Sequence, residues 1–204
     1  LLCSSPTASR RTSSTADPAP ALRPLTPSIA LRRPGLDAEA LAQLPRDPVD
    51  GDYRVLWVGD PRVIPVAAYT YQPGIGYALT DDGELTVHDF WSGRPTDVEA
   101  EVATALRQMA AGVTLRGGRL LAQYGIRYVV VPVADGANGT VGNPLPTPGG
   151  LVDVLEDQLD LAAPLTRPPN FLVYENTAYT PTRAVLTTAG AAASQEAGGE
   201  AMTT

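Results

Sequence analysis

The 204-residue chain has a single cysteine (Cys3), a single histidine (His88) and no lysine, so arginine supplies all 15 basic residues. One cysteine cannot form a disulfide within the chain, and one Cys with one His are too few ligands for a structural zinc site. A mechanism that needs two imidazoles is excluded for the same reason. Carboxylates alone remain as metal ligands, and we predict neither a metal nor a cofactor.

Positive charge and long apolar runs are also scarce. The 22 acidic residues give a net charge of −7 and a pI near 4.6, so the chain lacks the basic surface that binds nucleic acid, and we expect no such partner. A spanning helix needs about 20 consecutive apolar residues and a signal peptide an apolar run of about 7 to 15. The sequence contains neither.

Composition divides the chain into three parts. Residues 1–34 are rich in Pro, Ser, Thr and Ala without a sustained apolar period, which predicts a disordered tether. Residues 187–204 have the same character and predict a flexible or truncated tail. The intervening residues, 35–186, carry the apolar periodicities of one folded domain.

Local signals in residues 35–186 predict alternating strands and helices. The expected strands cover 53–58, 76–80, 85–91, 126–131, 161–166, 171–175 and 183–186, with the second and third joined as a hairpin through Asp82-Gly83. The expected helices cover 36–45, 96–113, 119–124 and 151–159, each from an apolar stripe or a capping pattern. This pattern predicts an α/β fold, a mixed sheet of about five to seven strands with two main helices packed on it.

Several segments together resemble a known family. They are residues 54–61, 118–132, 158–161, and 173–176 followed by 181–186. In order and spacing they are similar to the soluble extracytoplasmic region of large polytopic actinobacterial membrane proteins assigned to glycosyltransferase family 2. The ending, Tyr174-Glu-Asn176 followed by Pro-Thr-Arg-Ala, also resembles that of YfhO-type membrane proteins. The resemblance covers about residues 50 to 186.

The resemblance implies an accessory domain on the extracytoplasmic side of the cell membrane. It implies a role in cell-envelope polysaccharide synthesis, assisting acceptor or glycan handling without catalytic residues of its own. The implied partners are the membrane portion of the same polypeptide and a lipid-linked or envelope glycan. The apolar Leu1-Leu2-Cys3 fits the end of a preceding transmembrane span, and residues 1–34 then form the tether. The alternatives are a structural or protein-interaction module that binds no glycan, and an enzyme with a carboxylate-only site.

Four patterns suggest chemistry, but each has a simpler interpretation. Asp50-Gly-Asp52 imitates a sugar-nucleotide motif yet fits a turn before a strand, and Gly74-Ile-Gly76 lacks the third glycine and the helix of a phosphate cradle. His88 lies in a strand-like run and is expected at the surface. Four carboxylates in and just after the helix expected at 151–159 could suggest glycoside hydrolysis, but they alternate with its apolar residues and are expected on its solvated face. They are Asp153, Glu156, Asp157 and Asp160.

A ligand site is predicted at the carboxyl ends of the two strongest strands, because open α/β sheets present crevices there. The candidate residues are Trp57, Asp60, Arg62, Tyr128 and Asp135. Asp60 and Arg62 are suited to sugar hydroxyls or phosphate, and Trp57 or Tyr128 to stacking on a sugar ring. The alternative interpretation of Gly59-Asp-Pro61 is a type I turn. Similarly, Glu175 and Asn176 either contribute to a site or cap a strand end.

Overall fold

The computed structural model describes most of the chain between residues 52 and 181, and one earlier residue, Leu44. The described residues are 44, 52–81, 85, 87–91, 93–134, 145–163 and 170–181. The predicted tether and tail, the strand at 183–186 and, apart from Leu44, the helix at 36–45 lie outside them. Across the described ranges, no helix has both the length and the apolar character needed to cross a bilayer.

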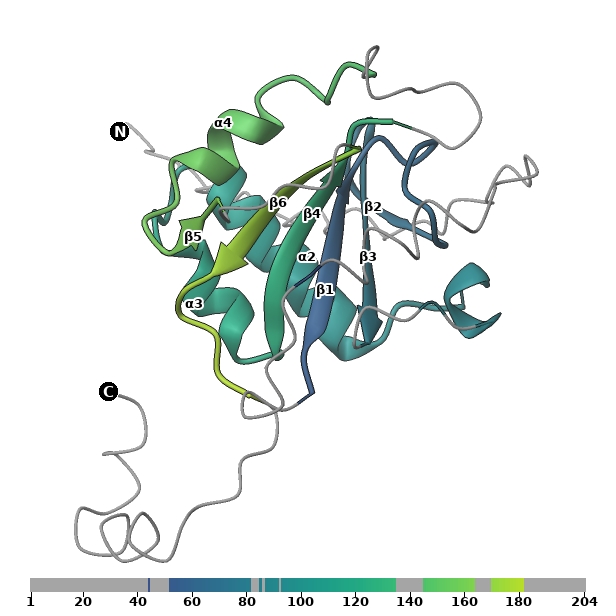
Figure 1. Ribbon diagram of the computed structural model, residues 1–204, viewed down its shortest axis with the longest axis horizontal. Coiled ribbons are helices and arrows are strands. Elements are labelled where there is room, and N and C mark those ends of the chain that lie inside the picture. Colours follow the sequence, from purple (N-terminus) through teal and green to yellow (C-terminus); the bar gives the residue numbers. More distant parts are fainter. Residues whose placement is uncertain are drawn as a thin grey trace, which may run out of the picture.

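The described residues form a six-stranded sheet with helices against it (Figure 1). In chain order the elements are β1 (Arg54–Gly59), β2 (Tyr69–Gln72), β3 (Ile75–Asp81), the 3-10 helix η1 (Val87–Phe90), α2 (Asp97–Ala110), α3 (Gly117–Ala122), β4 (Ile126–Pro132), α4 (Leu151–Glu156), β5 (Leu161–Ala162) and β6 (Phe171–Asn176). The strand order is β2-β3-β1-β4-β6-β5. The pair β1 and β4 is parallel and the other pairs are antiparallel, which confirms a mixed α/β fold.

The two most apolar strands, β1 and β4, lie at the centre of the sheet. Side chains of β1 alternate between two cores: Leu56 and Val58 face the helices, whereas Val55 and Trp57 face the opposite side. Every residue of β4 is buried, as its nearly continuous apolar sequence predicts. Helices α2, α3 and α4 all contribute to the first core and therefore cover the same face of the sheet.

The predicted hairpin between residues 76–80 and 85–91 is wrong. Residues 87–90 form η1, and β3 pairs instead with β2 on one side and β1 on the other, so both of its edges are occupied. The hairpin that does form joins β2 to β3 through Pro73-Gly74, where Gly74 has a φ of 77° that favours glycine. Asp82-Gly83, which suggested the other pairing, lies outside the described residues.

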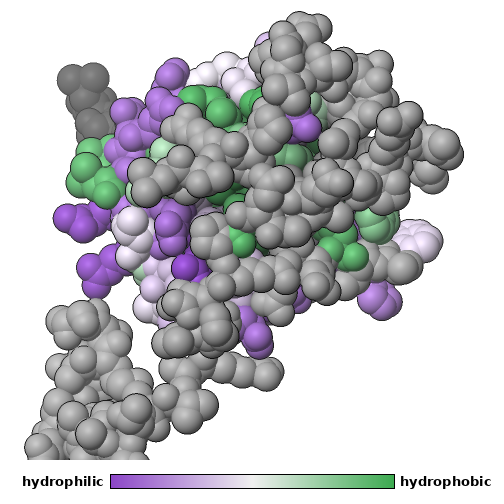
Figure 2. Space-filling model, viewed as in Figure 1, coloured by the Kyte–Doolittle hydropathy of each residue, from purple (hydrophilic) through white to green (hydrophobic). Residues whose placement is uncertain are grey.

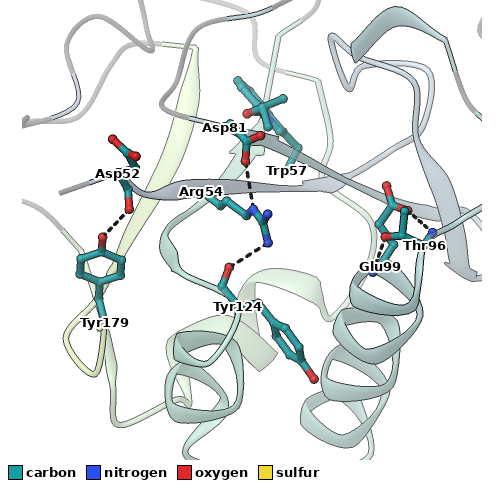
Figure 3. A network of polar contacts seen from close by, with 9 residues as sticks. Asp52, Arg54, Trp57, Asp81, Thr96, Glu99, Tyr124 and Tyr179 are labelled. Carbon is teal, nitrogen blue, oxygen red and sulfur yellow. Dashed lines mark hydrogen bonds and ion pairs between the residues drawn. The ribbon is translucent and has the colours of Figure 1, made fainter. Parts of the chain in front are cut away.

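Helix α2 begins where the sequence predicts but ends earlier than predicted. The Thr96 hydroxyl accepts the Glu99 N–H and the Glu99 carboxylate accepts the Thr96 N–H, forming the capping box that the sequence indicates (Figure 3). Gly112 has a φ of 66° and ends the helical path after Ala110. Val113, expected at the end of the buried stripe, is therefore outside the helix and 72% exposed.

The two shorter helices also differ from prediction at their ends. Helix α3 begins at Gly117, two residues earlier than expected, and Gly125 follows it with the predicted left-handed conformation (φ 71°). Helix α4 ends at Glu156, so the apolar stripe does not continue to Leu159, which is 71% exposed. Strand β5 spans two residues where six were expected.

At the amino end of β1, one arginine connects three parts of the chain. Arg54 Nε donates to Asp81 Oδ1 at the end of β3 (2.9 Å), and its Nη1 donates to the carbonyl of Tyr124 after α3 (3.3 Å; Figure 3). Nearby, the Tyr179 hydroxyl donates to the Asp52 carbonyl (3.0 Å). These contacts fix this end of the sheet and leave the opposite end for the candidate site.

Candidate functional site

The carboxyl ends of β1 and β4 lie side by side at one end of the sheet. A Cβ atom placed on Gly59 would lie 3.4 Å from Cδ of Pro132, the last residue of β4. Asp60 and Arg62 follow β1 directly and are therefore at the predicted position. Asp135 lies outside the described residues, so its place in the site stays a prediction.

Asp60 and Arg62 are brought together, but they contact each other. The Asp60 carboxylate accepts the Arg62 backbone N–H (2.9 Å) and hydrogen bonds from Nε and Nη2 of the Arg62 guanidinium. The Asp60 carbonyl accepts the N–H groups of Val63 and Ile64, which closes the turn. The Arg62 side-chain hydrogen bond is the main cause that lowers the pKa of Asp60 below its ordinary value. The structure thus gives this pair the turn-stabilising role that was the alternative interpretation.

The two predicted stacking rings lie in the second core. Trp57 and Tyr128 have no exposed surface. Trp57 Nε1 donates to the Thr80 hydroxyl (3.0 Å), and its ring packs edge-on against Phe171 at 5.8 Å between centroids. Tyr128 packs edge-on against Tyr53 at 5.4 Å. In this arrangement neither ring presents a face to solvent at the strand ends.

A β-bulge at Arg127 is the feature of β4 that sequence reasoning missed. Arg54 pairs with Ile126 but Val55 pairs with Tyr128, so Arg127 is the extra residue. As a result, Ile126 joins the first core while Tyr128 joins the second. The feature of the sequence that could have indicated the bulge is one arginine inside an otherwise apolar strand.

Arg127 is 8% exposed and lies among aromatic rings. Its guanidinium carbon is 5.8 Å from the ring centroid of Tyr53, 5.4 Å from that of Tyr128 and 5.6 Å from that of Tyr179. Its Nη2 lies 3.6 Å from Glu175 Oε1 on β6. This combination of cation–π contacts and an ion pair joins β1, β4 and β6, and gives Glu175 a structural partner.

Three side chains from distant parts of the sequence organise helix α3. The Asp160 carboxylate accepts the N–H groups of Gly118 (2.9 Å) and Arg119 (2.8 Å), and Gln158 Oε1 accepts the N–H of Gly117 (2.9 Å). These contacts satisfy the first donors of a helix whose N-cap residue provides no side-chain hydrogen bond.

Asn176 completes this arrangement, which we call the α3 cap (Gln158, Asp160 and Asn176). Its Nδ2 donates to the carbonyls of Gly118 (2.8 Å) and Ile126 (2.9 Å). Asp160 is 6% exposed, so its predicted place on a solvated helix face is wrong: α4 ends before it, and its carboxylate turns inward. Asn176 Oδ1 also accepts the Ala178 N–H (3.1 Å) in the turn after β6, as expected of a residue that caps the strand end.

The glycine pair at the start of α3 is required by space. A Cβ atom on Gly117 would lie 2.4 Å from the Met109 sulfur, and one on Gly118 would lie 2.4 Å from Asn176 Oδ1 and 2.8 Å from Asp160 Cγ. Any side chain at Gly118 would therefore push the cap residues away from the helix.

The remaining candidate motifs do not assemble a site. Gly74 is in the β2–β3 turn and Gly76 is within β3, so they do not form a phosphate cradle. His88 is exposed in η1, where the Asp89 carbonyl accepts the Ala67 N–H. Within the described ranges, no three His, Cys, Asp or Glu side chains are grouped to hold a metal ion.

A cavity of about 180 Å³ lies between the β2–β3 hairpin, the end of α2 and the start of α4. Its lining residues are Tyr71, Gln72, Ile75, Ala110, Gly149, Gly150, Leu151 and Val154. Ile75 begins β3 beside the end of β1, because Gly59 pairs with Gly76. The cavity therefore lies at the predicted end of the sheet, but on the helix side and with different residues.

The lining is uncharged and includes polar groups with no hydrogen bond to any other described residue. These groups are the Tyr71 hydroxyl, the Gln72 side-chain amide and the Gly149 N–H. Burial raises the pKa of Tyr71 to about 12, so the hydroxyl is neutral and protonated at physiological pH. Two hydrogen-bonding side chains among apolar groups are typical of sites for small neutral molecules.

Comparison with protein-family models, with curated proteins and with solved structures finds no match to this chain. The family resemblance therefore stays a prediction.

Proposed function

We propose that this chain is an extracytoplasmic accessory domain of a membrane-bound glycosyltransferase-like protein. It assists acceptor or glycan handling in envelope polysaccharide synthesis and leaves the bond chemistry to other parts of the polypeptide. Its partners are the membrane portion of the same polypeptide and a lipid-linked or envelope glycan. The observation that carries the proposal is the uncharged, partly polar cavity at the strand-end side of the sheet.

The fold supports the resemblance on which the proposal rests. Three of the resembling segments, 118–132, 158–161 and 173–176, meet in the α3 cap through Gly118, Asp160 and Asn176. A chain that had these segments in the same order would be expected to bring the same cap residues together.

The contacts of four carboxylates support a non-catalytic role. Asp60 pairs with Arg62, Glu99 caps α2, Asp160 caps α3 and Glu175 pairs with Arg127. Each of these carboxylates has a structural contact, whereas acid or base catalysis requires one within reach of a reacting group.

The proposal is tested by thermal unfolding of the 204-residue chain with soluble envelope glycans and lipid-linked oligosaccharides. A ligand that binds only the folded state raises the unfolding temperature. We expect a rise that saturates with at least one carbohydrate and is unchanged in Arg62→Ala, because Arg62 is occupied by Asp60. No rise with any carbohydrate in a broad panel would overturn the proposal.

An exposed apolar surface favours a second candidate, a module that packs against the membrane portion without binding sugar. Val113, Leu115 and Leu159 are 72%, 51% and 71% exposed, and the Leu159 N–H donates to the Leu115 carbonyl (2.8 Å). Gln158 and Asp160 on either side of Leu159 both turn inward as part of the α3 cap. Figure 2 shows apolar surface at its left edge, the side on which α4 and β5 lie in Figure 1.

Crosslinking in the parent polypeptide distinguishes this candidate. With Cys3 replaced by serine, Leu159→Cys is expected to crosslink to the membrane portion, while Glu101→Cys at an exposed position of α2 serves as the control. Equal crosslinking from both positions would argue against a specific contact through Leu159.

A further inference from the structure

We propose that the cavity between the β2–β3 hairpin, α2 and α4 binds one uncharged pyranose unit of a glycan. This inference rests on the proposed function and deepens it, because it names a site and a substrate class. The site differs from the one predicted at Asp60 and Arg62, since neither residue lines the cavity.

The cavity is open to solvent on one side, and its volume of about 180 Å³ suits one sugar ring better than a larger ligand. It is smaller than the sites of about 300 to 1,000 Å³ that enclose drug-sized ligands. A longer glycan would place one unit inside and extend the rest into solvent.

The lining selects against charge. None of the lining residues carries an ionised side chain at neutral pH, because a tyrosine phenol is protonated there and the other members are apolar residues, glycines or a glutamine. A phosphate or carboxylate placed there would lose its hydration without gaining a charged partner. Sugar acids and sugar phosphates are therefore disfavoured relative to neutral sugars.

The polar groups of the lining match a polyhydroxylated ring. The Gln72 amide offers donors and an acceptor, the Tyr71 hydroxyl offers one of each, and the Gly149 N–H offers a donor. Ile75, Leu151 and Val154 provide apolar contact for the C–H groups of the ring. No Cβ atom obstructs the glycine side of the cavity, since a Cβ on Gly149 would meet nothing within 4 Å.

The experiment measures saturation-transfer NMR and thermal shift on the 204-residue chain with glucose, galactose and mannose. Glucuronate and glucose 6-phosphate are the charged counterparts. Ala110→Leu fills the cavity from the end of α2, and Ala100→Leu is its matched control in the same helix. Gln72→Leu removes the amide, and Gln108→Leu is the control at an exposed position outside the lining.

We expect at least one neutral sugar to bind, Ala110→Leu to abolish binding and Gln72→Leu to weaken it about three- to tenfold, the range of one neutral hydrogen bond. Circular dichroism checks that each variant is folded. Tyr71→Phe, which removes one oxygen atom, gives a second and milder variant with the same expected direction.

Three outcomes would overturn the inference, and they are distinguishable from failure of the proposed function. Charged sugars that bind as tightly as neutral ones would contradict the substrate class. Neutral binding unaffected by Ala110→Leu and Gln72→Leu would place the site elsewhere. If no monosaccharide binds while a lipid-linked oligosaccharide still raises the unfolding temperature, the inference about the cavity fails, whereas the glycan binding that the proposed function requires is retained.

Discussion

Gly118 lies at a position with no room for a side chain. Because a Cβ there would lie within 3 Å of both Asn176 and Asp160, we expect Gly118→Ala to lower the free energy of unfolding by about 2 to 3 kcal/mol. Gly149→Ala is the matched control: its Cβ meets nothing within 4 Å, and we expect a change within about 0.5 kcal/mol. Urea unfolding measures both, and equal effects would contradict the spatial argument.

The pair of Asp60 and Arg62 predicts a small pH-dependent effect. The pKa of Asp60 is lowered in the folded state, so its contribution to stability is present above its ordinary value of 3.8 and is lost as the pH falls through the lowered folded value. Arg62 is exposed, so solvent screens the pair, and we expect Arg62→Ala to lower the unfolding temperature only slightly at pH 7.

At pH 2 the same variant is expected to show a smaller difference from the wild type. Thermal unfolding of both proteins at the two pH values measures the effect, with Arg94→Ala, which changes an exposed arginine elsewhere, as control. If the difference in unfolding temperature between Arg62→Ala and the wild type grew as the pH fell, the ion pair with Asp60 would not be its cause.

Among the elements, α2 permits a comparison of the same substitution at two positions. Thr96→Ala removes the capping hydroxyl and is expected to cost about 1 kcal/mol. Thr104 is exposed within the helix, where its hydroxyl bonds to the Ala100 carbonyl, and Thr104→Ala is expected to be neutral or stabilising by a few tenths of a kcal/mol. Chemical denaturation measures both, and two losses of equal size would contradict the capping role.

Sequence patterns predicted the elements that depend on interactions between residues close in sequence. The capping box of Thr96 and Glu99, the left-handed Gly125 and the apolar run of β4 each act within a few residues, and the structure confirms them. The β2–β3 pairing was missed because it depends on β1 occupying the other edge of β3, which no short segment encodes.

The candidate site was less accessible to prediction for the same reason. The sequence places Asp60 and Arg62 after a strand, and the structure agrees, but their pairing with each other is a property of the turn. Trp57 lies on a face that is buried by long-range packing, which an alternating strand pattern does not reveal. The cavity is lined by Tyr71, Ala110 and Gly149, which come from three separate parts of the chain, so no short sequence motif predicts it.

For the whole molecule, buried tyrosines predict alkaline unfolding. Burial raises the pKa of Tyr71 and of Tyr128 to about 12 from an ordinary value of 10, and that of Tyr77 also rises. The neutral phenols therefore contribute stability that is present below pH 10 and is lost as the pH rises toward 12. We expect the unfolding temperature to fall over this interval.

Ultraviolet titration of tyrosinate measures this prediction. In the folded chain the buried tyrosines are expected to ionise together with the loss of tertiary circular dichroism, and in 6 M guanidinium chloride all are expected to ionise near pH 10. Ionisation of all tyrosines with a midpoint near pH 10 and without loss of structure would show that these rings are accessible to solvent.

The α3 cap also determines when helix α3 can form during synthesis of the chain. Gln158, Asp160 and Asn176 lie 41, 42 and 58 residues beyond the backbone groups of α3 that they bind. A six-residue helix gains little stability alone, so α3 must wait until the chain as far as Asn176 has been synthesised and has joined the sheet. The middle of the domain is thus completed by β6, and a nascent chain that ends before Asn176 leaves the Gly118 carbonyl without this partner.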